Sequence, residues 1–240
     1  MNRWCGKVAF VTGASAGIGA AIAAKLVEDG LQVVGVARRL DKLQELASKL
    51  QNFPGKFHPL QADVTAEEDI IKAFEWVRGH LGTVHVLVNN AGIAKPASLI
   101  DGPSEIFRKI LDTNVLALTI TTKEALKLMR ENGDEGHVIH VNSVAGHRVT
   151  DVPLMNVYFA SKHAVTALAE TLRLDLRREG SKIRVTEFSD MFNKVLNDNW
   201  QAIFNYVKSG YESFFTEITV SLAGKFFDKV PLSEMLDNVE

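Results

Sequence analysis

The sequence predicts an α/β protein, a single domain of the Rossmann type built on a doubly wound parallel sheet. Two observations predict it. Apolar, strand-like runs alternate with stretches of helical periodicity along most of the 240 residues, and a glycine-rich loop separates the first run from the first helical stretch. Parallel strands need right-handed crossovers, which place helices on both faces of the sheet. The ligand crevice of such a fold lies at the carboxyl ends of its strands.

The glycine-rich loop follows the first expected strand, Lys7–Val11, and precedes a helix expected over Ala20–Glu28. Glycine lets a backbone turn tightly and approach a ligand without a Cβ in the way. The free amides and the positive end of the helix dipole then face an anion, typically a pyrophosphate, although a glycine turn that binds nothing is the alternative. The residues expected to contact a dinucleotide here are Gly13, Ser15, Ala16, Gly17, Ile18 and Gly19.

Further strands and helices follow in regular alternation. Strands are expected at 32–37, 56–62, 84–88, 137–141 and 182–186, and helices at 40–50, from about 65, at 104–130 and at 157–178. Pro59 weakens the third strand. Thr65 is suited to cap the helix that follows, with Glu67 and Glu68 in its first turn.

The domain divides into a core over residues 1–190 and an atypical tail over residues 191–240. The tail is expected to be mostly helical and part of the same domain. Apolar residues recur with helical spacing over 193–208, and 218–222 reads as a last strand.

Composition excludes several classes of function. A net charge of −2 gives no reason to expect a nucleic-acid partner. The single cysteine, Cys5, rules out an intrachain disulfide, which fits a reducing compartment such as the cytoplasm. No apolar run approaches the roughly 18 residues of a membrane span. His147, His163 and Trp200 have no partners at metal-ligand spacing, so we expect no metal and assign these three residues no function.

Polar or glycine residues close nearly every expected strand at the same edge of the sheet. Turn chemistry alone explains any one of them, but all of them together favour a ligand site. Besides the glycine loop, these strand ends are Ala37-Arg38-Arg39, Asp63-Val64, Asn89-Asn90-Ala91-Gly92 and Asn142-Ser143.

Tyr158 and Lys162 are four residues apart on a strongly helical pattern, so their side chains share one face. A phenol with a pKa of about 10 is a poor base at neutral pH. A nearby ammonium favours the phenolate and eases proton exchange with an alcohol or carbonyl oxygen. Ser143 is placed to hold the same oxygen by a hydrogen bond. Taken alone, the pair reads as a solvated helix face; its position downstream of Ser143 favours a catalytic role.

These patterns together resemble the short-chain dehydrogenase/reductase superfamily of the classical type. In its detailed sequence the chain resembles the insect farnesol-dehydrogenase-like branch, which is near the carbonyl and 17β-hydroxysteroid reductases. The resemblance runs from Lys7 to about Thr186, and its motifs are Thr12-Gly-x-x-x-Gly-x-Gly19, Asn89-Asn-Ala-Gly92, Asn114, Ser143 and Tyr158-x-x-x-Lys162.

The resemblance implies a role for each matching residue. Tyr158 is the general acid/base, Ser143 positions the substrate oxygen, and Lys162 lowers the pKa of the tyrosine and binds the nicotinamide ribose. Asn114 holds a water of the proton relay through a local helix irregularity; the alternative is a mid-helix Asn bonded to its own backbone. The other cofactor contacts implied are Asp63 and Val64 at the adenine, and Asn90, Ala91 and Gly92 along the groove.

The end of the second strand indicates which cofactor is used. An NAD site holds the ribose 2′-hydroxyl with an acidic residue about 20 residues after the glycine loop. Arg38 and Arg39 stand there instead, and a guanidinium suits the 2′-phosphate of NADP, although a solvated arginine pair is the alternative. The expected function is an NADP(H)-dependent oxidoreductase acting on a small-molecule alcohol or carbonyl compound. By resemblance the substrate is an isoprenoid alcohol such as farnesol or a steroid, and the enzyme is a homo-oligomer, dimer or tetramer.

The sequence departs from the family after the sixth strand. Members continue with a Ser-Pro-Gly-type segment and a threonine that grips the carboxamide. Here Glu187-Phe188 follows Thr186 directly and resembles the residues that usually come just after the carboxamide-binding threonine of the family. By this comparison about nine residues are missing between Thr186 and Glu187. This leaves a second hypothesis, a cofactor-binding variant with weak or no catalysis that acts as an interaction subunit. The intact Asn114, Ser143, Tyr158 and Lys162 favour the enzyme.

Overall fold

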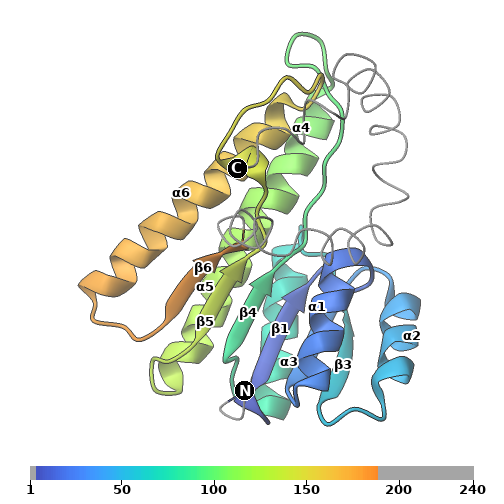
Figure 1. Cartoon of the computed structure of the whole chain (residues 1–240), viewed down its shortest axis with the longest axis vertical. Coiled ribbons are helices and arrows are strands. Elements are labelled where there is room, and N and C mark those ends of the chain that lie inside the picture. The colour runs from blue at the N-terminus through green and yellow to red at the C-terminus, as the bar shows by residue number, and fades with distance from the viewer. Residues whose placement is uncertain (1–3, 189–240) are drawn as a thin grey trace, which may run out of the picture. The chain divides into compact units, whose positions relative to one another are not determined.

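Six parallel strands form one sheet in the computed structural model, which describes residues 4–188 (Figure 1). The strand order is β3-β2-β1-β4-β5-β6, and every neighbouring pair is parallel. The order changes direction between β1 and β4, where a doubly wound sheet opens its ligand crevice. The predicted fold class is therefore confirmed. The strands are β1 (Val8–Thr12), β2 (Gln32–Ala37), β3 (Lys56–Gln61), β4 (Val86–Asn89), β5 (His137–His140) and β6 (Arg184–Glu187).

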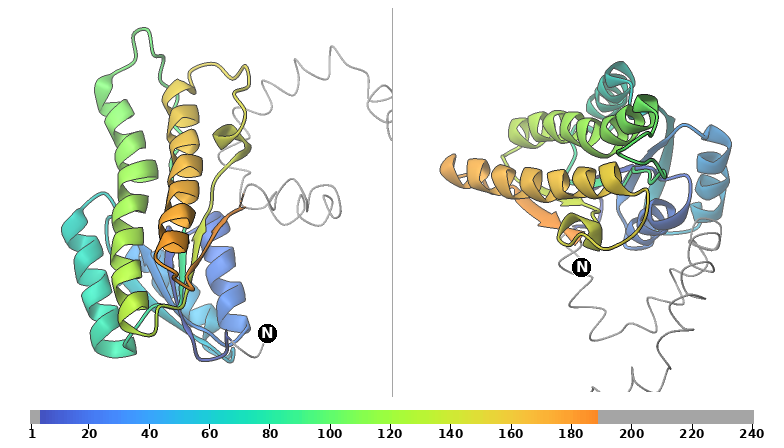
Figure 2. Two further views of the ribbon diagram at one scale, coloured as in Figure 1. Left: turned by 90° about the vertical axis from the view of Figure 1, so that its left-hand side faces the viewer. Right: turned by 90° about the horizontal axis from the view of Figure 1, so that it is seen from above.

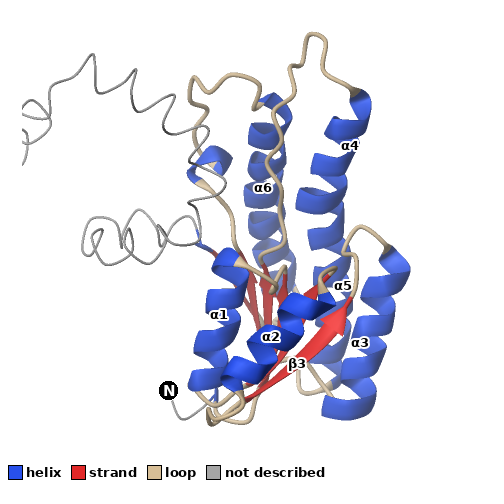
Figure 3. Ribbon diagram, turned by 90° about the vertical axis from the view of Figure 1, so that its right-hand side faces the viewer, coloured by secondary structure: helices blue, strands red, loops and turns tan. Residues whose placement is uncertain are grey.

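Helices cover both faces of the sheet. Figure 3 shows α1 and α2 in front of the strands, with α5 and α6 behind them, and Figure 2 shows the same two layers from the side and from above. The helices are α1 (Gly17–Glu28), α2 (Leu40–Leu50), α3 (Glu67–Leu81), α4 (Ser104–Leu111), α5 (Ala117–Glu131) and α6 (Asn156–Arg178). A π-helical turn, Asp112–Leu116, joins α4 to α5 in one long helix.

The alternation of side chains along β1 builds two separate cores. Val8 and Phe10 belong to the apolar cluster under α3, α5 and α6, where the rings of Phe10 and Phe74 stack 4.3 Å apart. Ala9 and Val11 point the other way, into the cluster under α1 and α2. Side chains of a strand point to opposite faces in turn, so a strand with both faces covered must be apolar throughout. Each large side chain buried in this way stabilises the fold by about 1.5–3 kcal/mol.

The predicted elements are found with shifts of a few residues at their ends. The strand at 56–61 forms despite Pro59, because β3 lies at the edge of the sheet, where a missing amide donor is tolerated. The expectation for Thr65 was wrong. Ala66 precedes α3 instead, and the Thr65 hydroxyl donates to the carboxylate of Asp63 at 2.8 Å. The short polar side chain satisfies a local turn rather than the helix.

The predicted tail, 191–240, lies outside the described residues, and so do its expected helix at 193–208 and strand at 218–222. Residues 4–188 contain no helix that combines the length and the apolar character needed to cross a bilayer.

Candidate active site

The glycine loop adopts backbone conformations that other residues rarely take. Gly13 has φ +69° and Gly17 has φ +55°. A Cβ on Gly19 would collide with the carbonyl of Gly13 and the side-chain amide of Asn90, so the loop closes against α1 only with glycine there. No side chain caps the first turn of α1, where Ala16 is the N-cap residue. The first amides of this 12-residue helix therefore suit an anion such as a pyrophosphate.

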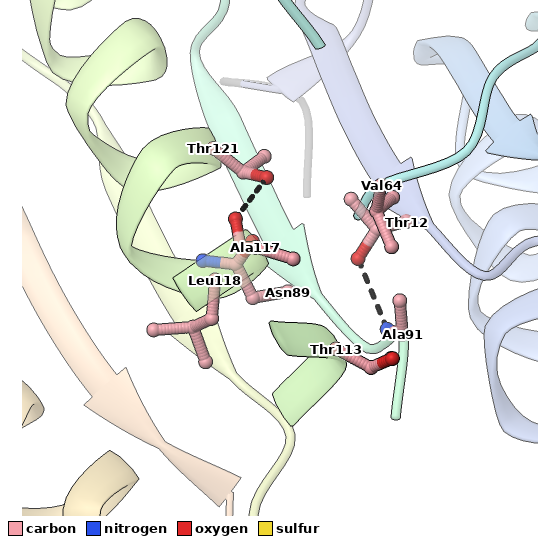
Figure 4. A pocket seen from close by; sticks show the side chains of 8 residues that line it. All are labelled: Thr12, Val64, Asn89, Ala91, Thr113, Ala117, Leu118 and Thr121. Atoms are coloured by element: carbon pink, nitrogen blue, oxygen red, sulfur yellow. Dashed lines mark hydrogen bonds between the residues drawn. The ribbon is translucent and has the colours of Figure 1, made fainter. Parts of the chain in front are cut away.

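Asn90 braces this loop from the end of β4. Its side-chain Nδ2 donates to the carbonyl of Thr12 at 3.0 Å. The backbone amides of Asn90 and Ala91 both donate to the Thr12 hydroxyl at 3.0 Å. Figure 4 shows Thr12, Ala91 and Val64 among the residues that line a narrow crevice at this edge of the sheet. The contribution of the Thr12 side chain was not predicted, because a threonine that ends a strand has no distinctive spacing.

Arg38 and Arg39 lie at the end of β2, and both are exposed. The guanidinium of Arg39 donates to the Ser15 hydroxyl, with Nη2 at 3.0 Å, so the end of β2 touches the glycine loop. The Asp63 carboxylate lies in the turn before α3, where it accepts a hydrogen bond from the amide of Thr65 at 2.9 Å. The strand ends predicted to form one site are therefore adjacent on this side of the sheet.

Asn114 sits in the π-helical turn and is 2% exposed. Its Oδ1 accepts from the amide of Ile93 at 2.8 Å, and its Nδ2 donates to the carbonyl of Ile93 at 2.9 Å. Nδ2 also donates to the Ser161 hydroxyl at 3.0 Å. The helix irregularity expected at this position is present. The alternative, an Asn bonded to its own backbone, does not describe this side chain.

Ser143 and Tyr158 meet at the carboxyl end of β5. Ser143 precedes a 3-10 turn, Val144–Gly146, and its Oγ accepts from the amide of Ala145 at 3.1 Å. The Tyr158 phenol lies near enough to the Ser143 side chain for the two to interact. Burial raises the pKa of Tyr158, and the interaction with Ser143 opposes that rise. The phenol is therefore a proton donor at neutral pH in this state.

Lys162 lies one helical turn after Tyr158 and is buried. Its Nζ donates to the carbonyl of Val141 at 3.2 Å and lies 5.9 Å from the centre of the Tyr158 ring. Burial lowers the pKa of Lys162 to about 8, although the charge of Glu187 acts to raise it. A Cβ built on Gly92 would lie 3.9 Å from this Nζ, so the end of the Asn89–Gly92 segment borders the lysine.

A buried carboxylate, which the sequence did not predict as part of the site, lies beside these residues. Glu187 ends β6, and one of its oxygens accepts hydrogen bonds from Asn142 Nδ2 and from His147 Nε2, the latter at 2.8 Å. His147 was assigned no function, yet it pairs with this carboxylate. The sequence did contain a signal that Glu187 is buried. Side chains alternate between the two faces of a strand, so Glu187 shares a face of β6 with Val185, which packs against the core under α6.

A groove of about 720 Å³ opens next to α6. His163 is exposed on this side, whereas Tyr158 and Lys162 lie on a different face of the helix. The groove is lined by residues 149–154 and by Asn156, Phe159, Ala160 and His163. Residues 4–188 hold no cluster of three side chains suited to a metal ion, and Trp200 lies outside them.

Comparison with known proteins gives the same picture. A family model described as short chain dehydrogenase matches residues 7–189. A second model, haemolymph juvenile hormone binding protein, matches residues 183–237, nearly all of them outside the described part. The chain is 47% identical over 191 residues to a farnesol dehydrogenase of Aedes aegypti, which covers 79% of this chain and 78% of that protein. It is 44% identical over 189 residues to the human dehydrogenase/reductase SDR family member 11, covering 78% and 73%.

Solved structures are similar in fold. A short-chain dehydrogenase from Burkholderia phymatum in complex with NAD matches with a TM-score of 0.73 and 28% identity, over 78% of this chain and 66% of that one. An alcohol dehydrogenase from Thermococcus sibiricus, complexed with 5-hydroxy-NADP, matches with a TM-score of 0.69 and 30% identity, over 75% and 74%. With the family model covering most of the chain, this protein is an oxidoreductase that belongs to the short-chain dehydrogenase family.

Proposed function

We propose that the protein is an NADP(H)-dependent oxidoreductase that interconverts an alcohol and a carbonyl compound, with Tyr158 as the general acid/base. The observation that carries the proposal is the position of the Tyr158 phenol beside Ser143, with the Lys162 ammonium 5.9 Å from the centre of the tyrosine ring. NADP(H), when bound, supplies or accepts the hydride.

The side chains of this centre have complementary tasks. Ser143 holds the substrate oxygen, and Tyr158 donates a proton to it during reduction or accepts one during oxidation. Lys162 places a positive charge near the phenol, which favours the phenolate once the proton has left. Asn114 fixes the segment after β4 through Ile93 and holds α6 through Ser161, and in the proposed relay it also positions a water.

The residues around the glycine loop fit NADP. The uncapped start of α1 suits the pyrophosphate, with Gly13, Ser15, Ala16, Gly17, Ile18 and Gly19 as its cradle. Arg38 and Arg39 suit the 2′-phosphate, because a guanidinium matches a phosphate in charge and geometry. The adenine and groove contacts of the proposal are Asp63, Val64, Asn90, Ala91 and Gly92.

An apolar substrate fits the surroundings of the site. The segment after β4 pairs with the loop before α6, since the amide of Ala97 donates to the carbonyl of Leu154 at 2.7 Å. These two segments present Leu99, Ile100 and Val149 to solvent with large exposed fractions. Together with the similarity to a farnesol dehydrogenase, this favours an isoprenoid alcohol or its aldehyde as the substrate.

The proposal is tested with the purified 240-residue chain. NADPH oxidation is followed with aldehydes and ketones, and NADP⁺ reduction with isoprenoid alcohols and steroids. Turnover by the wild type that disappears in Tyr158→Phe supports the proposal. Tight NADP(H) binding without turnover on any substrate would favour the non-catalytic hypothesis instead.

A further inference from the structure

Glu187 stands out because its side chain is a carboxylate buried where three elements meet. The residue is 3% exposed, at the end of β6. An ionised carboxylate is costly to bury unless hydrogen-bond donors and positive groups surround it. Its surroundings therefore show what the charge does.

Donors from two directions converge on one oxygen of Glu187. Asn142 Nδ2 and His147 Nε2 both contact Oε1 of Glu187. In the sequence, these two residues lie before and after Ser143. The hydroxyl of Thr166 lies 3.1 Å from the same oxygen and belongs to α6. Thr166 is one helical turn beyond Lys162, so the carboxylate bridges the turn of Ser143 and the helix of Tyr158 and Lys162.

Asn142 strengthens this connection. Its Nδ2 also donates to the carbonyl of Lys162 at 3.1 Å, which links the end of β5 to the backbone of the lysine itself. Thr166 in turn lies 3.0 Å from the carbonyl of Gly146, within the turn after Ser143. Ser143 and Lys162 are therefore held in one hydrogen-bonded assembly centred on Glu187.

The groups around the carboxylate are positive or can become so. From α6, Lys162 and Arg173 contribute charge, and from β5 the buried His140 responds to both of them and to Glu187. His147 approaches from the turn after β5. A single carboxylate among these groups offsets their mutual repulsion, and its effect is strong because the site is shielded from water.

We propose that Glu187 is a positioning residue of the catalytic centre, whose carboxylate clamps the turn of Ser143 against α6 and provides the counter-charge of Lys162. This inference rests on the proposed function for its effect on turnover. It gives β6 a role in this chain at the point where the sequence departs from its family. The charge state of Lys162 is the property that distinguishes this role from a merely structural one.

The test compares Glu187→Gln with the wild type. The amide has the same shape but no charge, so the pKa of Lys162 should fall, because a neighbouring anion no longer favours the ammonium. Lysine labelled with ¹³C at Cε reports this pKa by NMR, with the signal assigned by its loss in Lys162→Arg. We expect kcat to fall about 10- to 100-fold, since small misplacements of catalytic groups have effects of this size. NADP(H) affinity should change less than about threefold.

Glu75→Gln removes an exposed carboxylate from α3 and serves as the matched control, with neither quantity changed. An unaltered pKa of Lys162 in a folded Glu187→Gln protein would overturn the proposal. If Glu187→Gln does not fold, Glu187→Asp takes its place, because it keeps the charge but shortens the side chain. In this variant the pKa of Lys162 should stay near that of the wild type while kcat falls. An unchanged kcat would reject the clamp. The NMR titration needs no substrate, so a wild type without turnover would refute the proposed function and leave this test intact.

Discussion

Asn114 and Ile93 form a reciprocal pair of hydrogen bonds, in which the Asn114 side chain replaces a strand partner for the Ile93 backbone. Oδ1 accepts from the amide at 2.8 Å, and Nδ2 donates to the carbonyl at 2.9 Å. The segment that leaves β4 is thereby fixed to the middle of the α4–α5 helix. Since Nδ2 also donates to Ser161 in α6, one side chain sets the spacing of the three elements that carry the site.

Asn114→Ala should therefore destabilise the protein. The truncated side chain leaves both backbone groups of Ile93 without their partner, and each unsatisfied group costs about 1–3 kcal/mol when buried. The Ser161 hydroxyl loses the donor Asn114 but still donates to the carbonyl of Tyr158. Because Ile93 is only partly buried, we expect a loss of about 2 kcal/mol in the free energy of unfolding, measured by urea titration. Asn132→Ala, at the exposed end of α5, is the matched control and should cost less than about 1 kcal/mol. Equal losses in the two variants would contradict this account.

The fold was predictable because its signals are local. The alternation of apolar runs and helical stretches, with glycine after the first run, determines the sheet and its crossovers, and a shift of one or two residues at an element's end changes none of it. The sequence also predicted that Ser143 and Tyr158 serve one oxygen, because the helical Tyr158–Lys162 pair follows shortly after Ser143 in a fold of this type.

The missed features depend on contacts between distant residues. The pairing of His147 with Glu187 joins positions 40 residues apart, and no spacing rule announces it. Thr12 and Asn90 are 78 residues apart, and the sequence shows only that each ends a strand. Thr65 was assigned to a helix cap because Thr is a common cap, whereas the nearby Asp63 carboxylate competed for its hydroxyl.

Tyr158→Phe should lower turnover by about 10²- to 10⁴-fold, the usual contribution of a general acid/base. The ring keeps its packing and only the ionisable oxygen is lost, so NADP(H) affinity and the unfolding midpoint should stay near those of the wild type. Steady-state kinetics and cofactor fluorescence measure the two effects. Near-normal turnover in this variant would place the proton transfer elsewhere.

Arg38→Ala should weaken NADP(H) binding about 10- to 100-fold and leave NAD(H) binding unchanged, because one charge-assisted contact to the 2′-phosphate contributes about 1.5–3 kcal/mol. Arg39→Ala should have a smaller effect, since the guanidinium of Arg39 is engaged with Ser15. Lys49→Ala removes an exposed positive charge from the far end of α2 and is the control. Titration calorimetry with both cofactors decides, and equal losses for NADP(H) and NAD(H) would contradict the assignment.

His140 should make the protein sensitive to acid. Burial lowers the pKa of His140 from 6.5 to about 4. Between these two pH values the imidazole is protonated in the unfolded chain but stays neutral in the folded protein. The resulting stability is fully present above pH 6.5 and is lost as the pH falls towards 4, by about 3 kcal/mol in all. His140→Gln removes the titrating group and should flatten the fall of the unfolding midpoint between pH 6.5 and 4. An equally steep fall in this variant would assign the acid sensitivity to other groups.

The adenosine half of the site should supply most of the cofactor affinity. The glycine loop, Arg38, Val64 and Asn90 lie together at the ends of β1 to β4, and all of them face this half in the proposed arrangement. In the proposed arrangement the nicotinamide half lies towards the end of β6, where the sequence resembles its family less closely. Adenosine 2′,5′-bisphosphate should therefore bind within about tenfold of NADP⁺, a difference of at most about 1.4 kcal/mol. Adenosine 5′-monophosphate, which lacks the 2′-phosphate, should bind at least about tenfold more weakly than the bisphosphate. A bisphosphate that binds a hundredfold more weakly than NADP⁺ would instead mean that residues beyond Thr186 grip the nicotinamide half.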